Sequence, residues 1–367
     1  MQDELLYQIG ITLIPNVGPV NAKRLIAYCG SAQAVFCEKK EFLLKIPGVG
    51  DVVASSVKTQ DVLKRSEEEI TFINKHKIAP LYFLNDDYPE RLKHCHDSPV
   101  MLYYRGNASL NHDKVLAIVG TRRFTPYGKD ITQEIVKGLA ECGVLIVSGM
   151  AFGIDITAHR AALSEGLPTV GVMGHGLHTI YPPAHRATAE RMVTGNGGII
   201  TEFMSNSAFE KENFPMRNRI IAGLADCVLV SEARSGGGAL ITAEIANTYN
   251  RDVFAVPGRT IDECSKGCNY LIRSNKASLC EKAEDILYLM GWQAETAKPK
   301  AVQTSIPVDL NEDEQKIYDL LKQQESIPVD TLCFQSGIST GKAAAILLNL
   351  ELKGHVKSLP GKVYQAI

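Results

Sequence analysis

The sequence has no excess of charge of either sign, no long apolar run and no regular spacing of cysteines. Its 39 lysines and arginines are balanced by 41 aspartates and glutamates, which gives a formal net charge of -2. Such a chain has no overall field that attracts phosphate, so a nucleic-acid site would need a local cluster of Lys and Arg. No apolar stretch approaches the roughly 20 residues of a membrane span, and residues 1–10 lack a signal-peptide pattern. We therefore predict a cytoplasmic protein without membrane contact.

Patterns typical of metal centres and catalytic sites are also missing. Among the nine cysteines, Cys264 and Cys268 form a C-x3-C pair, but no second pair or histidine couple accompanies them. The sequence contains no G-x-S-x-G, no H-E-x-x-H and no paired carboxylates at a recognisable spacing. These absences predict free thiols in a reducing compartment, no metal, no catalytic residues and hence no enzyme activity.

At 367 residues the chain is too long for one ordinary domain. Residues 1–76 have helical patterns, and residues 77–292 alternate apolar runs with helical patterns. Residues 293–307 are polar and contain Lys and Pro, whereas residues 308–367 again contain helices. We predict, in that order, a helical helix-hairpin-helix (SAM-like) domain, an extended Rossmann-like domain, a linker and a winged-helix domain.

The first of these domains contains a weak internal repeat. Leu13–Leu25 and Lys45–Ala54 both read as an apolar residue, a turn and a helix start. Asn16 stands in the first turn where Gly48 stands in the second, and Asn tolerates a left-handed backbone. Such turns let the amides at the start of the second helix approach a phosphate. A purely structural helical module explains the repeat equally well, so both interpretations stay open.

The middle of the chain predicts a doubly wound parallel sheet. Its apolar runs are continuous, as in strands buried on both faces, and helical patterns such as Tyr127–Cys142 and Ala239–Asn250 separate them. Repeated strand–helix units imply right-handed crossovers and a ligand site at the carboxyl ends of the strands. The expected strands are Val115–Val119, Val144–Val147, Thr169–Val172, Gly198–Ile200, Cys227–Val230 and Val253–Val256.

The last domain shows the winged-helix order of three helices and a hairpin. We expect helices at Asn311–Gln324, near Thr331 and at Ser339–Leu352, followed by a hairpin to Ile367. The third helix, which would read DNA, has only Lys342 and Lys353 as cations. A protein-contact role is therefore at least as consistent with this domain as duplex binding.

Three glycine-rich turns each follow an expected strand and precede an expected helix: Gly120–Gly128, Ser148–Asp155 and Ser235–Thr242. None is a G-x-G-x-x-G or a P-loop, so we predict no dinucleotide cofactor. Three such turns along one sheet edge predict outward-facing groups of backbone amides that suit an anion. Arg122 and Arg123 in the first turn add planar donors for phosphate.

Two further groups of polar residues have less specific explanations. Asp155 and Thr242 could simply cap their helices. Asp155 and His159 have a spacing that would permit acid–base chemistry, but a pair that orients a tight turn explains them better. His175, His178 and His185 lack a nearby cysteine or carboxylate, so we interpret them as surface histidines of a turn rather than a zinc site.

The stretch Phe209–Ile221 (FEKENFPMRNRII) gathers cations and aromatics in a chain that has no net positive charge. Lys211, Arg217 and Arg219 surround Phe214, which is the combination that holds something anionic and flat. A solvated helix start is the other interpretation. In that case Arg217 and Arg219 would pair with acids such as Glu232 or Asp226 and lock the loop or a dimer.

Taken together, the glycine turns and this stretch resemble the DprA (Smf) family of bacterial DNA-processing proteins. The most specific string is Phe214–Leu224 (FPMRNRIIAGL). Four positions depart from the family pattern, because His178, His185, Gly238 and Asn275 replace the usual Asp, Asn, Ser and Gly. The other matching strings are Gly120–Arg122 with Tyr127-Gly128, Ser148–Ala151 with Gly153–Asp155, Gly174–Leu177 with Tyr181-Pro182, Glu232-Ala233, Leu240–Ala243, Ala255–Gly258 and Gly267–Ile272.

The resemblance implies a homodimer, formed through the Rossmann-like domain, that binds and protects incoming single-stranded DNA and loads the RecA recombinase during natural transformation. The cations would hold phosphates and Phe214 would stack on a base. Two alternatives remain, a phosphoribohydrolase-like enzyme that uses Gly236–Gly238 with Glu244, and a binder of small nucleotides. The expected nucleic-acid-binding residues are Gly120, Thr121, Arg122, Arg123, Gly149, Gly153, Lys211, Phe214, Arg217, Asn218, Arg219, Gly236 and Gly237.

Overall fold

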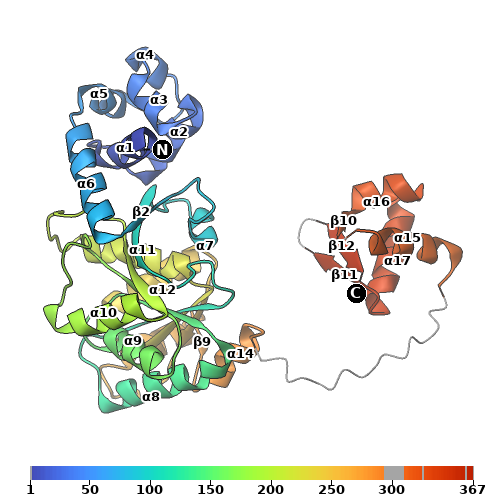
Figure 1. The fold of residues 1–367 in the computed structure, drawn as a ribbon. Coiled ribbons are helices and arrows are strands. Elements are labelled where there is room, and N and C mark those ends of the chain that lie inside the picture. Colours follow the sequence, from blue (N-terminus) through green and yellow to red (C-terminus); the bar gives the residue numbers. More distant parts are fainter. Residues whose placement is uncertain (1, 293–309, 325, 360–361, 367) are drawn as a thin grey trace. The chain divides into compact units, whose positions relative to one another are not determined.

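A computed structural model describes residues 2–292, 310–324, 326–359 and 362–366. The chain divides into two compact units, Met1–Ala294 and Glu295–Ile367, each with its own hydrophobic core (Figure 1). The predicted linker, 293–307, lies outside the described residues. No helix among those that are described is long and apolar enough to cross a bilayer.

The first unit begins with a group of short helices, and two of its turns repeat as predicted. Asn16 has φ 64° and Gly48 has φ 79°, so both turns use the left-handed backbone that Asn and Gly tolerate. Gly18 and Gly50 then begin the following helices without a side-chain cap. The elements are α1 (Gln2–Gly10), η1 (Ile11–Leu13), α2 (Pro19–Cys29), α3 (Ala32–Cys37), α4 (Lys40–Leu43), α5 (Asp51–Thr59) and α6 (Leu63–His76).

A nine-stranded sheet forms the centre of this unit, in the order β1-β2-β6-β5-β4-β3-β7-β8-β9. The predicted parallel, doubly wound sheet is confirmed from β6 to β9, and all six expected strands are present. The sequence did not reveal β9 or the antiparallel strands β1 and β2, which extend the sheet at its margins. The strands are β1 (Ala79–Tyr82), β2 (Met101–Gly106), β3 (Val115–Gly120), β4 (Leu145–Ser148), β5 (Thr169–Val172), β6 (Gly197–Thr201), β7 (Cys227–Glu232), β8 (Asp252–Ala255) and β9 (Ser278–Leu279).

Helices cover both faces of the sheet, which explains why the strands are continuously apolar. Along β3, Leu116 and Ile118 join the core beneath α8 and α9, whereas Ala117 and Val119 join the core beneath α11 and α12. The helical elements are α7 (Glu90–Lys93), α8 (Pro126–Gly138), η2 (Ala140–Cys142), α9 (Ile154–Ser164), η3 (Pro183–His185), α10 (Arg186–Thr194), α11 (Asn213–Leu224), α12 (Gly238–Thr248), α13 (Lys266–Arg273) and α14 (Ala283–Leu289).

The strand order reverses beside β3. From β3 the chain builds β4, β5 and β6 outward on one side and later returns to build β7, β8 and β9 on the other. The connections that leave the carboxyl ends of β3 and β7 therefore diverge, and a crevice opens between them. This switch point holds the candidate site.

The second unit has the predicted winged-helix order. Its three helices pack around a core that includes Leu332 and Leu347, and the terminal hairpin gains a short third strand that the sequence did not indicate. Its elements are α15 (Glu312–Lys322), β10 (Ile327–Pro328), α16 (Val329–Ser336), α17 (Thr340–Leu352), β11 (Val356–Leu359) and β12 (Val363–Ala366).

Two lysines, Lys342 on α17 and Lys353 directly after it, form ion pairs. Lys342 pairs with Asp313, and Lys353 pairs with the buried carboxylate of Glu314 at 3.1 Å. The most exposed large apolar side chain of this unit is Phe334, which is 89% exposed. This surface suits a protein contact better than it suits duplex DNA.

Candidate nucleic-acid interface

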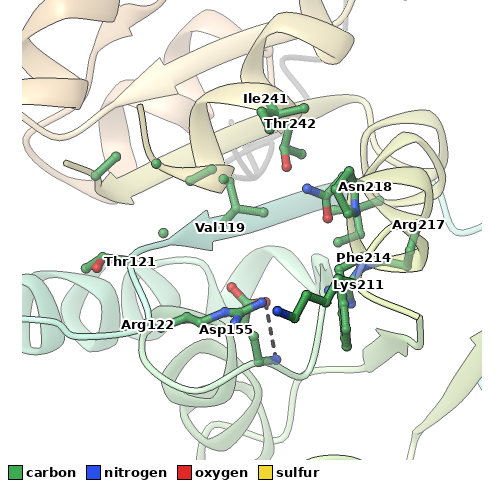
Figure 2. A pocket seen from close by; sticks show the side chains of 18 of the residues that line it. Val119, Thr121, Arg122, Asp155, Lys211, Phe214, Arg217, Asn218, Ile241 and Thr242 are labelled. Atoms are coloured by element: carbon green, nitrogen blue, oxygen red, sulfur yellow. Dashed lines mark hydrogen bonds between the residues drawn. The ribbon is translucent and has the colours of Figure 1, made fainter. Parts of the chain in front are cut away.

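An open cavity of about 770 Å³ lies at the switch point, between the carboxyl ends of β3 and β7 and the start of α11 (Figure 2). It brings together segments that are up to about a hundred residues apart in the sequence. Eight of the expected residues line this cavity: Gly120, Thr121, Arg122, Lys211, Phe214, Arg217, Asn218 and Gly237.

Cations dominate the charge of the cavity. Arg122 and Lys211 are exposed and reach toward Asp155 from opposite sides in Figure 2. Arg234, which the sequence interpretation missed, adds a third exposed cation next to the last glycine turn. None of these three forms an ion pair with a residue that the structure describes. Asp155 is the one acidic residue in the lining, so the cavity suits an anion.

Aromatic rings form one wall of the cavity. The ring of Phe214 is half-buried, and its centroid lies 5.6 Å from that of Phe209 and 6.5 Å from that of Tyr181. The guanidinium of Arg122 lies 5.7 Å from the centroid of Phe214. Phe209 and Tyr181 are each about half exposed, at 49% and 47%. The sequence interpretation placed neither among the expected binding residues, although both lie in stretches it singled out. This wall offers a flat face beside free cations.

Arg217 lines the cavity but its guanidinium is already engaged. The side chain is 4% exposed, and Nη1 donates to the backbone oxygens of Gly149 and Val172. Burial lowers the pKa of Arg217 to about 10, and the charge of Asp155 opposes that shift. Gly149 is required because a Cβ there would overlap the guanidinium. Arg217 therefore has a structural role that ties the ends of β4 and β5 together, and its phosphate contact stays a prediction.

Some of the backbone amides of the second glycine turn are already bonded within the protein. Asp155 is buried and accepts from the amide of Ala151 at 3.4 Å, while the amide of Ile154 donates to the Thr121 oxygen at 3.2 Å. Burial raises the pKa of Asp155, and Arg217 opposes that effect. Gly153 has φ 87° and packs so closely on Thr121 that no side chain would fit. These bonds and the close packing of Gly153 give the turn a structural role, and a phosphate contact of its glycines stays a prediction.

In the first glycine turn, side chains bind two of the backbone amides. Glu232 accepts from the amide of Thr125 at 2.9 Å and from its hydroxyl at 2.7 Å, and Thr125 in turn caps the amide of Gly128. Glu232 is thus a helix-capping residue and not the suggested partner of Arg217. The helices after the second and third turns, α9 and α12, begin without a side-chain cap, and Gly237 and Gly238 of the third turn line the cavity. The expected capping role of Thr242 is wrong, because it lies inside α12.

Arg219 lies outside the cavity, contrary to the sequence interpretation. Its guanidinium pairs with Glu202 and donates to the Asp97 oxygen at 2.6 Å. It is 9% exposed. Asp226, the other suggested partner, binds Arg91 at 2.6 Å instead. Arg219 is therefore a structural residue within this unit.

The remaining expected residues are spread around the cavity rather than inside it. Gly236 is exposed with φ 72° and shapes the turn before α12 without lining the cavity. Arg123 and Gly153 line a neighbouring groove between α8 and α9. Gly149 lines a small pocket of about 40 Å³ that joins the cavity to this groove.

Of the three histidines that we interpreted as surface residues of a turn, two are buried. His175 and His185 are buried, and each ring bonds to a backbone oxygen, that of Gly176 at 3.0 Å and that of Met150 at 2.8 Å. Only His178 is exposed. No group of three His, Cys, Asp or Glu side chains that could hold a metal exists within the described ranges.

His159 does not pair with Asp155, although Asp155 does orient the turn. Nδ1 of His159 lies 2.7 Å from the hydroxyl of Thr169, and burial lowers the pKa of His159 to about 3. Because this ring stays neutral and is directed at β5, the arrangement does not form an acid–base couple.

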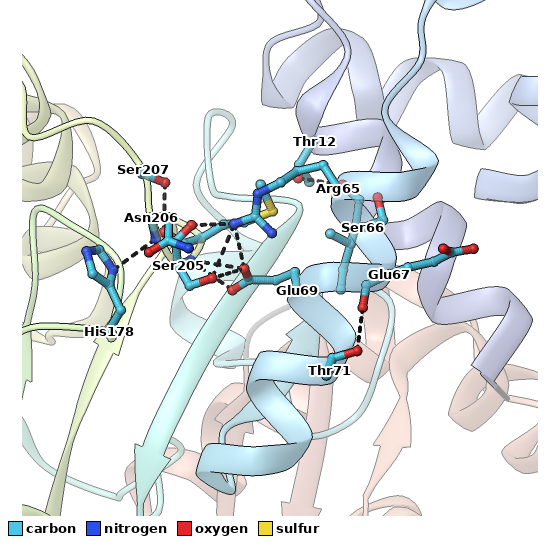
Figure 3. A network of polar contacts seen from close by, with 12 residues as sticks. Thr12, Arg65, Ser66, Glu67, Glu69, Thr71, His178, Ser205, Asn206 and Ser207 are labelled. Carbon is cyan, nitrogen blue, oxygen red and sulfur yellow. Dashed lines mark hydrogen bonds and ion pairs between the residues drawn. The ribbon is translucent and has the colours of Figure 1, made fainter.

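The loop that carries Phe209 and Lys211 is anchored by the N-terminal helices (Figure 3). Glu69 of α6 is buried and accepts from the amide of Ser205 at 2.9 Å and from its hydroxyl. Arg65 pairs with Glu69 at 2.8 Å and donates to the oxygen of Ser205. This network fixes the base of the loop beside the cavity, and sequence patterns gave no sign of it.

The carboxylate that a phosphoribohydrolase-like site would need lies outside the cavity. Glu244 forms an ion pair with Lys276 at 2.6 Å and does not line the cavity. The three glycines before it therefore have no facing carboxylate from α12.

Two models of known protein families match this chain. A family model described as DNA recombination-mediator protein A matches residues 80–291, and one described as the DprA winged helix domain matches residues 299–362. The chain is 32% identical to the protein Smf of Synechocystis, over 99% of this chain and 98% of that protein. It is 40% identical to DNA processing protein DprA of Streptococcus pneumoniae, over 58% of this chain and 74% of that protein.

Two solved structures are similar to this chain. The X-ray structure of DprA from Streptococcus pneumoniae superposes with a TM-score of 0.66 at 31% identity, over 77% of this chain and 97% of that one. DNA processing protein A from Helicobacter pylori, described for its single-stranded DNA binding mode, gives a TM-score of 0.53 at 29% identity, over 58% and 95% of the two chains.

Proposed function

This chain belongs to the DNA recombination-mediator protein A (DprA/Smf) family, as its motifs predicted, and we propose that its Rossmann-like domain binds single-stranded DNA. The observation that supports this most directly is the switch-point cavity, in which unpaired cations lie beside half-exposed aromatic rings. The cations would neutralise phosphates and the rings would stack on bases. A relative from Helicobacter pylori is described as binding single-stranded DNA.

The geometry favours single strands over duplexes. A base can reach the ring of Phe214 only if it is unstacked from its neighbours, which costs little in a single strand. The cavity has no helix that projects outward to enter a major groove, and its cations lie in a concave site. We therefore expect little sequence preference, because every base has a face that can stack.

An experiment on Lys211 tests this proposal. We expect Lys211→Ala to weaken binding of an oligothymidylate and to make the log–log salt dependence shallower by about 0.7 units, as for one lost phosphate contact. Its melting temperature should stay unchanged, because Lys211 is exposed and forms no ion pair with the described residues. The control is Lys137→Ala on α8, which removes the same charge away from the cavity. Equal affinity of the parent for single and double strands would contradict the proposal.

We also propose that the bound strand is handed to a RecA recombinase. The support is the family to which the chain belongs, whose description is that of a recombination mediator. The test is the ATPase of RecA on DNA that is already covered by a single-strand binding protein. The chain should shorten the lag before ATP hydrolysis begins, and Lys211→Ala should restore the lag. A lag that the chain leaves unchanged would contradict loading.

We further infer a homodimer through the Rossmann-like domain. β9 is the edge strand of the sheet, and large apolar side chains are exposed on this part of the chain. Such exposure is typical of an interface. The side chains are Tyr270 (42%), Leu279 (46%), Tyr288 (73%) and Leu289 (55%). Sedimentation equilibrium should show a dimer for the parent and a monomer for Leu279→Asp with Tyr288→Asp, whereas a monomeric parent would rule the dimer out.

A further inference from the structure

A second open depression, of about 730 Å³, lies between α8 and α9 and is here called the α8–α9 groove. The two helices lie side by side in Figure 1. Four cations line the groove, and all four are exposed: Arg122, Arg123, Lys129 and Arg160. No acidic residue lines it. None of the four forms an ion pair with any residue within the described parts of the chain.

Each of the two helices that form the groove contributes one cation. Lys129 and Gln133 are one turn apart on α8 and face Ile156 and Arg160, which are one turn apart on α9. Because side chains at this spacing share a helix face, Lys129 and Arg160 point toward the groove from its two helices.

Two aromatic side chains line the groove together with these cations. Phe124, from the turn after β3, is 38% exposed, and Phe152, from the turn after β4, is 49% exposed. Phe152 is held edge-to-face against the buried ring of His185, with centroids 4.8 Å apart. A phenylalanine that is fixed in place and open to solvent is a suitable platform for a base.

The α8–α9 groove lies next to the switch-point cavity, and a small pocket borders both. The small pocket of about 40 Å³ between them shares Phe214 and Tyr181 with the cavity and Phe152 with the groove. Arg122 lines all three. A strand that leaves the cavity past Arg122 would next meet the ring of Phe152 and then Lys129 and Arg160, the helix cations of the groove.

Four unpaired cations around one depression repel each other, and a polyanion that follows the groove relieves this repulsion. A backbone with one phosphate per nucleotide and exposed bases matches the combination of cations and rings in the lining. A duplex does not match, because its bases cannot reach Phe152 or Phe124.

We propose that the α8–α9 groove is a second binding segment for single-stranded DNA and holds the nucleotides that continue from the strand in the switch-point cavity. This proposal rests on the proposed function of the cavity. Lys129 and Arg160 would contact phosphates from the two walls, and Phe152 would stack on a base.

The test compares a short and a long oligothymidylate, of roughly 4 and roughly 12 nucleotides, with the full chain. Lys129→Ala combined with Arg160→Ala should weaken binding of the long oligonucleotide roughly tenfold at low salt. It should also make its salt dependence shallower by about 1.4 units, for two lost phosphate contacts. Affinity for the short oligonucleotide, which the cavity alone can hold, should stay the same.

The matched control is Lys137→Ala combined with Arg191→Ala, which removes two exposed cations from α8 and α10 that line none of the three depressions. It should leave both oligonucleotides bound as in the parent. Phe152→Ala should weaken the long oligonucleotide without a change in salt dependence.

Three results would overturn the proposal. If the double variant weakens both oligonucleotides equally, or if the control pair causes the same loss, the effect is one of overall charge. If it weakens neither, the groove does not touch the strand. If the parent binds neither oligonucleotide, the proposed function of the cavity is wrong, and the proposal for the groove is wrong with it. Lys211→Ala then has no effect on binding either, which separates this result from a failure of the groove proposal alone.

Discussion

Arg217 and Arg219 are two positions apart on α11 and therefore point to different sides of the helix. Arg217 faces the ends of β4 and β5 and borders the cavity, whereas Arg219 faces Glu202 and Asp97 on the other side. Both guanidiniums are buried and bonded to this unit. The exposed cations of the cavity are instead Arg122, Lys211 and Arg234.

Arg217→Ala should mainly destabilise the protein. The change leaves the Gly149 and Val172 oxygens and the buried carboxyl of Asp155 without their donor or counter-charge, which costs about 3 kcal/mol. Arg217→Lys should recover only part of this, because one ammonium cannot reproduce the planar fork. Thermal unfolding of both variants measures the effect. An unchanged melting temperature with a salt dependence of DNA binding shallower by about 0.7 units would instead assign Arg217 to a phosphate.

Phe214→Ala should weaken single-stranded DNA binding by about 1–3 kcal/mol through the loss of one stacking face. Its ring is half-buried against Gly174, so a modest drop in melting temperature is also expected. Fluorescence anisotropy with an oligothymidylate measures the affinity, and the salt dependence should not change. Phe42→Ala, on α4 and 40% exposed, is the control. Normal binding by the Phe214 variant would place that residue in the structural core only.

At the scale of elements, the loop between β6 and α11 depends on a helix from the N-terminal group. Residues 202–212 carry Phe209 and Lys211 to the cavity, and α6 holds the start of this loop through Glu69 and Ser205. The amide of Asn206 also donates to Nδ1 of His178 at 3.0 Å. The N-terminal helices are thus part of what positions the candidate site.

Glu69→Ala should therefore affect both stability and binding. It removes the acceptor of the buried Ser205 amide and hydroxyl and leaves Arg65 unpaired, which costs about 3 kcal/mol. The freed loop should also bind single-stranded DNA severalfold more weakly. Glu67→Ala, an exposed neighbour on the same helix in Figure 3, should change neither the melting temperature nor the affinity. Equal behaviour of the two variants would show that α6 does not support the loop.

At the scale of the whole molecule, the two compact units have separate hydrophobic cores. We expect a chain that ends at Trp292 to fold and to bind single-stranded DNA with nearly the parent's affinity. The reason is that Lys342 and Lys353, the cations of α17, are already paired with acids. Binding titrations of the truncated and full chains, each checked by thermal unfolding, measure this. A folded truncation that has lost its affinity would assign the main contact to the winged helix.

Local patterns in the sequence determined the order of elements. Continuous apolar runs predicted six buried parallel strands, because both faces of this sheet are covered and each strand must be apolar on both sides. Asn16 and Gly48 marked equivalent turns, because few residues accept a left-handed backbone. The string from Phe214 to Leu224 located α11 and pointed to the family.

Only the tertiary structure decided which polar groups remain free to bind a ligand. Sequence spacing cannot show that Asp155 and Glu232 already occupy the amides of two glycine turns, or that Arg219 pairs with Glu202, since those partners are distant in the chain or depend on side-chain direction. Nor could it show that Glu69 anchors Ser205 across 136 positions. Burial and pairing are properties of the packed molecule, and they leave Arg122, Lys211 and Arg234 as the exposed cations of the cavity that form no ion pair with a described residue.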